Sequence, residues 1–507
     1  MMTVLFCIFL ALGLVVYYFR REKRRFNLPP GPSMTALLGY LGQKDHKHAW
    51  KQFEEWHKKH GPLITVKIGQ LTVIVLGSHK VAKDLLSNRS PIYSSRPRLV
   101  VAQECFAQGF GAGVLPHGPA WKRAHQLQMT LLNARRCDLY RPLQELESCQ
   151  LLRDLLTSHD FSKEMHRYSS SLLFALLYGR RFPAGTEPEL KEIEELAGDL
   201  ANSLGFGKWI VDIFPVLNVI PRRFAKWKRV GDDFHRRQIK LFQKNTALAL
   251  ETSTWNWTKQ SIKETESLAS EKETVFALSE LFEAGSHSTH AALVVAVLAC
   301  LCYPETMRNV QKELDTAVPE DQLVELANLQ NLPYLRAFVR EVLRWRPIVP
   351  GGIPHSPMRD DVYGEFFIPQ GAMVVANHWS LDMDETVFED AQAFKPERWI
   401  KNPQLPLAAF GFGRRSCPGQ QLTQNSLIIV IARLLWAFDI VCEHEQREAL
   451  HSLGSTSEGA FSKPCKFKAR FEVRGPVRER VVRQGCQGME ERFESIMKTI
   501  GERFNGV

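Results

Sequence analysis

The chain has 507 residues, 44% of them hydrophobic and 24% charged, so it can bury one large core or two ordinary ones and is not a disordered protein. Its ten cysteines contain no C-x-x-C pair and are sparse for this length, which disfavours a disulfide scaffold or zinc cluster and predicts mostly reduced thiols. The formal net charge of +10 is scattered without a nucleic-acid-binding motif, and therefore favours a basic docking face for an acidic partner or a membrane over nucleic acid.

The amino-terminal residues 3–19 form an uncharged apolar run, followed at once by the basic run 20–25. At about 1.5 Å per residue the apolar run spans about 25 Å, just enough for a bilayer core. A cleaved signal peptide is the alternative, but it would carry its basic residues before the apolar run. We therefore expect a transmembrane anchor at 3–19, with the chain from Arg20 onward in the cytosol. A basic and proline-rich linker over 20–43 would separate the anchor from the globule.

The globular part is expected over residues 44–474. Runs with the character of β-strands occur at 63–68, 71–76 and 362–375, while most of the rest has helical periodicity. This pattern predicts a mainly α fold with a minor β-sheet region.

Two helices and a helical tail follow from apolar spacing. One helix should start at Pro333 and stop before Pro347. Another, over 274–303, is apolar on nearly all sides after Ala291 and should be buried through the middle of the protein. The tail, 475–507, is charged but has an apolar stripe. We expect the stripe to pack on the globule, with contact to a partner or a membrane surface as the alternative. Its residues are Met489, Phe493, Ile496, Met497 and Ile500.

The segment 410–419, FGFGRRSCPG, places a lone cysteine in a glycine-rich loop. A thiolate that serves as a metal ligand needs backbone N–H donors, a tight loop to direct it and a cation nearby. An isolated cysteine is more often an ordinary core residue. Here a five-position pattern favours the ligand: Phe410, Gly413, Arg415, Cys417 and Gly419.

On this pattern the chain resembles the haem-thiolate cytochrome P450 family, in which this loop carries the axial cysteine. The resemblance runs from Pro29 to about Arg474. The segments 93–97 (YSSRP) and 178–181 (YGRR) are most similar to membrane-bound fungal members that serve secondary metabolism. The resemblance implies the cytochrome P450 fold with an N-terminal transmembrane helix, and haem as the cofactor, held by Cys417.

A second motif resembles the family's E-x-x-R. Glu341 and Arg344 lie on the helix that starts at Pro333, and their i, i+3 spacing lets them share a face and form an ion pair. FKPERW, residues 394–399, resembles the segment whose arginine, Arg398 here, joins that pair. The role implied for the three residues is structural.

Haem propionates need hydrogen-bond donors. Residues 121–125 resemble the family's W-x-x-x-R with histidine in the last place, so Trp121 and a protonated or N–H-donating His125 are candidates. His355 occupies another place where relatives contact a propionate, and Arg415 can serve the same carboxylates. Each histidine alone would be an ordinary surface or core residue.

The expected buried helix carries AGSHST, residues 284–289, which resembles the family's A-G-x-D/E-T-T/S. Gly285 would make room over the haem, while an acid and a hydroxyl would help to deliver protons to bound oxygen. His287 stands at the acid's place, Ser288 at the threonine's, and Thr289 follows. Ser288 keeps a hydroxyl, and His287 could titrate near neutrality as a relay. The alternative, that His287 binds a metal together with His290, lacks a third ligand.

The resemblance implies a membrane-anchored monooxygenase that oxidises a lipophilic small molecule with O2 and electrons from NADPH through a cytochrome reductase. Segments 100–115 and 204–220 resemble the family's variable loop over the haem and its membrane-facing roof. We expect a single-pass protein of the endoplasmic reticulum with a cytosolic catalytic domain. A haem-thiolate isomerase or dehydratase that needs no reductase is the alternative enzyme, and a non-catalytic haem-binding protein the alternative of another class.

Overall fold

The structure, a computed structural model, describes residues 27–33, 37, 48–203, 208–265, 270–329, 331–452, 455–456, 461–504 and 506. The expected transmembrane anchor at 3–19 and the basic run 20–25 lie outside the described residues. Within the described ranges, one helix is long and apolar enough to cross a membrane, α14 (Glu271–Cys302), and most of it is buried inside the protein. The transmembrane part of the fold expected from the sequence therefore stays a prediction.

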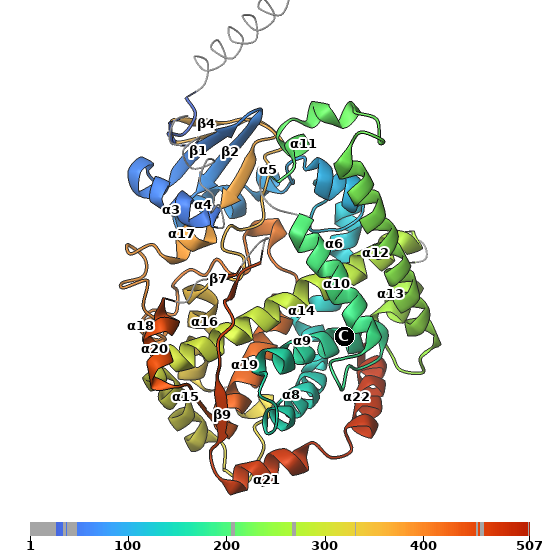
Figure 1. The fold of residues 1–507 in the computed structure, drawn as a ribbon, viewed down its shortest axis with the longest axis vertical. Helices are drawn as coiled ribbons and strands as arrows, with labels where there is room; N and C mark the ends of the chain where they lie inside the picture. The colour runs from blue at the N-terminus through green and yellow to red at the C-terminus, as the bar shows by residue number, and fades with distance from the viewer. Residues whose placement is uncertain are drawn as a thin grey trace, which may run out of the picture.

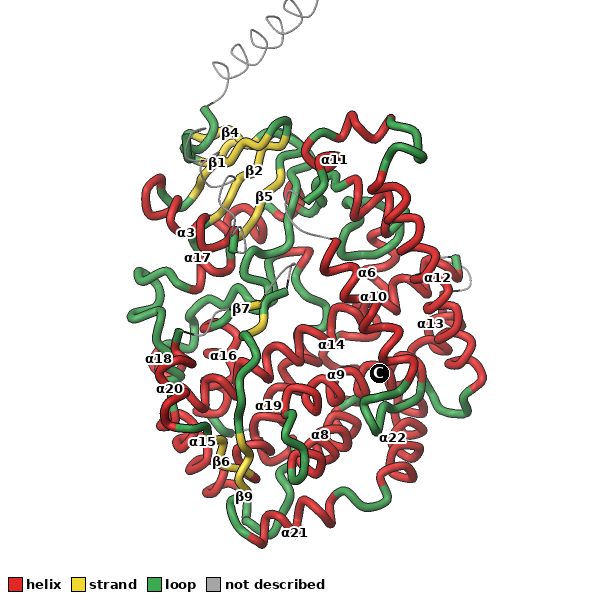
Figure 2. Tube along the Cα trace, in the orientation of Figure 1, coloured by secondary structure: helices red, strands yellow, loops and turns green. Residues whose placement is uncertain are grey.

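Helices make up most of the molecule, and the strands gather mainly at one end (Figure 1, Figure 2). In chain order the other helices are α3 (Ala49–His60), α4 (His79–Ala82), α5 (Ser90–Tyr93), α6 (Pro119–Leu132), α7 (Ala134–Leu139), α8 (Arg141–Leu155), α9 (Phe161–Tyr178), α10 (Pro188–Ser203), α11 (Ile210–Ile213), α12 (Lys226–Glu251), α13 (Trp257–Thr265), α15 (Pro304–Ala317), α16 (Pro333–Trp345), α17 (His378–Asp382), α18 (Glu397–Lys401), α19 (Gln420–Ala437), α20 (His444–His451), α21 (Pro476–Gly485) and α22 (Met489–Phe504). Two π-helical segments, η1 (Lys83–Asn88) and η2 (Val100–Phe106), and three short 3-10 segments, η3 (Pro215–Val219), η4 (Leu326–Leu329) and η5 (Gly413–Arg415), connect them.

The strands form one three-stranded sheet and three two-stranded ribbons within the described chain. In the three-stranded sheet, β1 (Leu63–Ile68) pairs antiparallel with β2 (Leu71–Leu76), and β2 pairs parallel with β5 (Met373–Ala376), with Val73 opposite Met373. The ribbons are β3 (Asp361–Tyr363) with β4 (Phe366–Ile368), β6 (Phe438–Val441) with β9 (Arg470–Val473), and β7 (Ser455–Thr456) with β8 (Lys463–Pro464). The predicted strands at 63–68 and 71–76 are confirmed, and the predicted run 362–375 contains parts of β3 and β5 and all of β4.

The helix α14 crosses the middle of the molecule, with α9 and α19 beside it (Figure 1). It begins with a capping box, in which Ser270 Oγ accepts from the Glu273 N–H at 3.2 Å and the Glu273 carboxylate accepts from the Ser270 N–H at 3.0 Å. Every residue from Thr289 to Cys302 is buried. The predicted buried helix is confirmed, because a helix that is apolar all round can be covered only from all sides.

The predicted helix from Pro333 is also confirmed as α16. Proline stands at its first turn, and the helix ends at Trp345, two residues before Pro347. Its buried face holds Glu341 and Arg344, which are fully enclosed. This helix therefore carries an ion pair into the core.

The tail forms α21 and α22, which lie along one edge of the molecule, with α22 beside α8 (Figure 1). The predicted stripe packs on the globule as expected, and Phe504 extends it. Met489, Phe493, Met497, Ile500 and Phe504 are buried. The Arg136 guanidinium lies 3.8 Å from the centre of the Phe504 ring, so a cation–π contact helps to hold the last turn.

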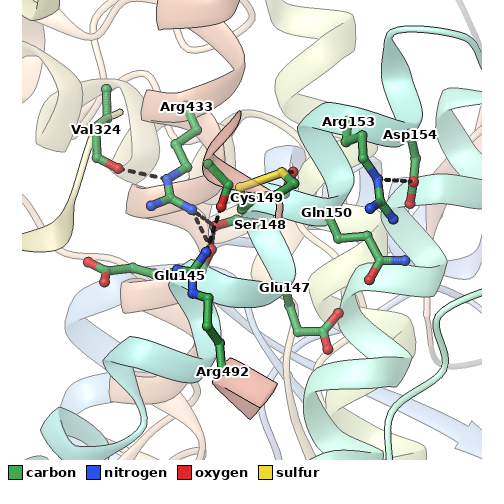
Figure 3. Close-up of a disulfide and its surroundings, with 12 residues drawn as sticks. Glu145, Glu147, Ser148, Cys149, Gln150, Arg153, Asp154, Val324, Arg433 and Arg492 are labelled. Carbon is green, nitrogen blue, oxygen red and sulfur yellow. Dashed lines mark hydrogen bonds and ion pairs between the residues drawn. A yellow bond between two sulfur atoms is a disulfide. The ribbon is translucent and has the colours of Figure 1, made fainter. Parts of the chain in front are cut away.

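A disulfide between Cys149 on α8 and Cys486 fixes this tail, with the two Cα atoms 5.9 Å apart (Figure 3). Next to it, Arg433 of α19 donates to Ser148 Oγ at 2.8 Å and to the Val324 carbonyl at 2.7 Å. Seven cysteines of the described chain are free, in line with mostly reduced thiols. The bridge joins residues 337 positions apart, which is why cysteine spacing gave no indication of it.

Candidate active site

The Cys417 loop lies between η5 and α19, and its backbone is tightly fixed. The Cys417 N–H donates to the Phe410 carbonyl at 2.8 Å. Gly413 has a φ of +58°, and a Cβ there would come within 2.1 Å of the Leu86 carbonyl oxygen, so the loop can follow this path only with glycine. The predicted need for glycine is thereby explained at Gly413. At Gly419 a Cβ would meet only ordinary contacts.

The Cys417 side chain is exposed, yet burial raises the pKa of its thiol. Both observations hold if the sulfur faces an internal space and not the outer surface. The Gly419 N–H acts in the opposite direction and lowers that pKa. A thiol with a backbone donor beside it and room in front of it is suited to lose its proton on binding a metal.

Two arginines lie next to this loop. The Arg415 guanidinium donates to the carbonyls of Ser94 at 2.7 Å and Leu115 at 2.8 Å, and lies 4.2 Å from the centre of the Trp121 ring. Arg96 donates to the carbonyls of Gly113 at 2.9 Å and Pro354 at 2.7 Å. Arg415 was predicted from the sequence. Arg96 was missed, although the YSSRP segment that contains it was noted as a family feature.

The electrostatics of this region show an excess of positive charge. Burial and the charge of Arg96 lower the pKa of Arg415 to about 9, and burial lowers the pKa of Arg96 to about 10. The carboxylate of Glu280 offsets both effects in part. Two guanidinium groups this close together, with lowered pKa values, favour the binding of an anion in addition to the Glu280 carboxylate.

The three predicted aromatic donors border the same region. The rings of Trp121 and His125 stack with their centres 4.9 Å apart, and His355 Nδ1 lies 2.9 Å from the Tyr93 carbonyl. Burial, with the charge of Arg415, lowers the pKa of His125, and burial with the charge of Arg96 lowers the pKa of His355 to about 3. Both imidazoles are therefore neutral at pH 7, and the protonated alternative for His125 is not favoured. Because the Tyr93 carbonyl can only accept, the single N–H of neutral His355 lies on Nδ1, and its Nε2 could donate to a propionate only after gaining a proton.

These residues fit a haem. Its iron needs an accessible thiolate, which Cys417 can provide, and its two propionates need cations and N–H donors. Arg415, Arg96 and Trp121 meet that need at the border of the Cys417 loop.

The AGSHST segment lies in α14, where Ala284 is exposed although the helix is central. The Ser288 hydroxyl donates to the Ala284 carbonyl at 2.8 Å, so the two residues share a face. Gly285 faces elsewhere, because a Cβ there would come within 2.8 Å of Leu173 Cδ1 on α9. The expectation that Gly285 makes room over the haem is therefore wrong: it lets α9 pack closely. Thr289 is buried in the helix packing.

His287 points into a cluster of histidines. Its ring stacks on His166 of α9, with the ring centres 5.3 Å apart, and His166 Nδ1 lies 3.0 Å from the Glu194 carboxylate of α10. Burial and the neighbouring His166 lower the pKa of His287 to about 4. The expectation of titration near neutrality is wrong, because packing against α9 keeps this imidazole neutral. His290 Nε2 lies 3.0 Å from Ser162 Oγ, so its ring is engaged in a hydrogen bond within the protein.

The predicted ion-pair motif is present in full. Glu341 accepts from Arg344 at 2.7 and 2.9 Å and from Arg398 Nε at 3.2 Å, and all three side chains are almost completely buried. The same carboxylate accepts from Trp399 Nε1 at 2.8 Å and from the Lys395 N–H at 2.9 Å. One carboxylate thus links α16 to the segment before the Cys417 loop.

Comparison with known proteins places this geometry in a family. The model of the family "Cytochrome P450" matches residues 29–466. Cytochrome P450 monooxygenase aneD of Aspergillus aculeatus is 41% identical over 94% of this chain and 94% of its own length. Cytochrome P450 monooxygenase drtD of Aspergillus calidoustus is 39% identical over 93% of this chain and 90% of its own. A solved zebra fish cytochrome P450 structure with progesterone shares the fold, with a TM-score of 0.72 at 23% identity over 84% of this chain and 99% of that one.

The chain belongs to the cytochrome P450 family and is a cytochrome P450 monooxygenase, an oxidoreductase. Its cofactor is haem iron with a cysteine thiolate ligand. Its substrates are O2 and a small molecule, and a redox partner supplies electrons.

Proposed function

We propose that this protein is a membrane-anchored monooxygenase that hydroxylates a lipophilic small molecule in fungal secondary metabolism, with electrons from NADPH through a cytochrome reductase. The observation that carries the proposal is the accessible Cys417 thiol beside the Arg415 and Arg96 cluster. Its full-length similarity to monooxygenases of Aspergillus species supports the fungal setting.

In this proposal Cys417 would hold the haem iron through its thiolate, which the Gly419 N–H stabilises. Trp121, His125 and Arg415, together with Arg96, would hold the propionates, and His355 would join them with a proton on Nε2. Bound haem would supply the activation of O2: with two electrons from the reductase and two protons, one oxygen atom would enter a C–H bond of the substrate and the other would leave as water. The Glu341 cluster fixes α16 against the segment that leads into the Cys417 loop.

Proton delivery is assigned to α14. The hydroxyl of Ser288 shares a face with the exposed Ala284 and can orient a proton-donating water toward the reaction centre. His287 is neutral, so it can accept a proton on one ring nitrogen and release one from the other. The Glu194 side chain is 45% exposed, which gives the row from Glu194 through His166 to His287 an entrance from solvent.

Two surfaces suit the expected partners. Near the Cys417 loop, Lys122 and Arg414 are exposed. Burial lowers the pKa of His117, and the charges of Lys122, Arg415 and Arg414 lower it further, so this face is basic and suits an acidic reductase domain. At the end of the molecule that carries β1 and β2, exposed apolar side chains of 208–224 suit contact with a membrane (Figure 1). These are Ile210, Val216, Val219 and Phe224. A single pass through the endoplasmic reticulum membrane, ahead of a cytosolic catalytic domain, follows the same proposal.

Replacement of the ligand tests the proposal. Microsomes that contain the wild-type protein should give the carbon monoxide difference spectrum of a thiolate-ligated ferrous haem, and Cys417→Ala should remove it. Cys442→Ala, a free cysteine away from this loop, is the matched control and should leave the spectrum intact. A thiolate spectrum retained by Cys417→Ala would contradict the proposal.

A further inference from the structure

The Glu283 carboxyl group lies on α14 beside the candidate site, and no cation among the described residues pairs with it. Glu283 directly precedes Ala284 on α14, and its side chain is partly accessible in the interior of the protein. Burial and the nearby Glu280 raise the pKa of Glu283 to about 7. Among the described residues, no lysine, arginine or histidine lies within ion-pair distance of it, and its hydrogen bond to Gln238 Nε2 is long, at 3.4 Å.

The polar atoms near Glu283 that lack partners are hydrogen-bond acceptors. Gln238 of α12 is 7% exposed, and its Oε1 has no partner within the described chain. The Glu280 carboxylate uses Oε1 to accept from the Gly113 N–H at 2.7 Å, and its Oε2 has no hydrogen-bond partner within the described chain. Burial raises the pKa of Glu280, and the charge of nearby Arg96 opposes this in part. A buried acceptor without a donor is costly, so two such atoms next to the Glu283 carboxyl group are unlike the packing of an ordinary helix interface.

The location of this group connects it to the candidate active site. Gly113, which binds Glu280, adjoins Ala112, whose carbonyl accepts from Arg415 at 3.0 Å. In the other direction along α14, Glu280, Ala284 and Ser288 follow one another at intervals of four residues and share a face. Glu280 therefore lies on the face of α14 that carries Ala284 and Ser288, and Glu283, three residues further along the helix, lies beside that face.

The nearby side chains are mostly apolar and aromatic, and the Lys272 ammonium lies 4.4 Å from the centre of the Phe110 ring. Phe106 stacks on Phe234 of α12 with ring centres 4.7 Å apart, and Phe110 stacks on Phe276 of α14 at 4.8 Å. A lipophilic molecule in such surroundings would bury its hydrocarbon, but without a donor it would leave the acceptors unpaired. The chemistry that satisfies both conditions is a hydrocarbon body with one donating, positively charged group.

We propose that Glu283, with Gln238 and Glu280, binds the protonated basic nitrogen of an otherwise lipophilic substrate. The proposal rests on the proposed monooxygenase function and deepens it by naming the substrate class. The carboxylate of Glu283 forms a charge-assisted hydrogen bond with one N–H, and a primary or secondary ammonium has further N–H groups for Gln238 Oε1 and Glu280 Oε2. This contact would orient the molecule so that a carbon remote from the nitrogen reaches the oxidising centre.

Ligand binding to the purified full-length holoenzyme tests this assignment. The probes are N,N-dimethyldodecylamine, which is protonated at pH 7, and N,N-dimethyldodecanamide, which has the same chain but no charge and no donor. Perturbation of the haem absorption spectrum gives a Kd for each, and a spectrum typical of nitrogen coordinated to iron is scored as no binding at Glu283. We expect the amine to bind about tenfold or more tightly than the amide, as a charge-assisted hydrogen bond in a buried site predicts.

Glu283→Gln should abolish that preference while leaving the Kd of the amide within about twofold of wild type, because the shape of the pocket is retained. Glu271→Gln, an exposed glutamate in the first turn of the same helix, is the matched control and should keep the preference. Equal binding of amine and amide to the wild type, no binding of the amine, or a preference retained in Glu283→Gln would overturn the assignment. The carbon monoxide spectrum and NADPH-dependent turnover report separately on the proposed function, and both can hold while this assignment fails.

Discussion

The buried carboxylate of Glu341 offers the sharpest test of how the scaffold beside the candidate site is held. It accepts hydrogen bonds from Arg344, Arg398, Trp399 and the Lys395 backbone, and its own side chain is fully enclosed. Glu341→Gln keeps the shape but removes the charge and turns an N–H2 group toward donors. The change leaves buried arginine charge without its partner, which costs about 3–5 kcal/mol.

This loss can be converted into a melting temperature. With about 2.1 cal/mol/K of unfolding entropy per residue, a cooperative unit of roughly 450 residues has an unfolding entropy of about 0.9 kcal/mol/K, so Glu341→Gln should lower Tm by about 3–5 °C. Differential scanning calorimetry of the holoprotein measures it. The control is Glu305→Gln, because Glu305 and Arg308 form an i, i+3 pair that is exposed, and it should leave Tm unchanged. Equal melting temperatures for Glu341→Gln and wild type would refute the reasoning.

Three further predictions concern protons and the tail. Glu194→Gln should reduce product formed per NADPH up to about tenfold by blocking the entrance to the histidine row, and Glu192→Gln on the same helix should not; equal yields would exclude this route. The pKa of His287 is about 4 in the folded protein and about 6.5 in the unfolded chain, so the free energy of unfolding should fall as pH drops from about 6.5 toward 4, by up to about 1.4 kcal/mol per pH unit. An acid-unfolding curve that is unchanged in His287→Leu would contradict this. Reduction of the Cys149–Cys486 disulfide should weaken docking of the tail by about 2–4 kcal/mol, which hydrogen exchange would detect as faster exchange in α21 and α22 while the haem spectrum stays unaltered. Unchanged exchange would mean that packing alone holds the tail.

Local features of the fold were predictable from the sequence because they depend on local patterns. The strands at 63–68 and 71–76 follow from apolar residues bounded by glycine, and α16 is bounded by prolines that the sequence shows directly. The Glu341–Arg344 pair follows from helical spacing alone. The Cys417 loop was identified because five matching positions define it.

Features that depend on distant parts of the chain were not predictable. The close packing at Gly285 involves Leu173, and the pKa of His287 is lowered by burial and by His166; both partners lie more than 100 residues away in the sequence. Arg96 reaches the candidate site only through carbonyls that the fold brings to it. The sequence could identify which residue types are present at these positions, but their charge state and neighbours are set by tertiary packing.

The measurement that tests the central claim most directly is the mass of the product formed under isotopic O2. Microsomes that contain this protein and a cytochrome reductase would be supplied with a lipophilic extract of the source organism, with and without NADPH. A monooxygenase predicts a product that carries one labelled oxygen atom and forms only with NADPH. Unlabelled product, formed equally without NADPH, would contradict the account and indicate an isomerase or dehydratase.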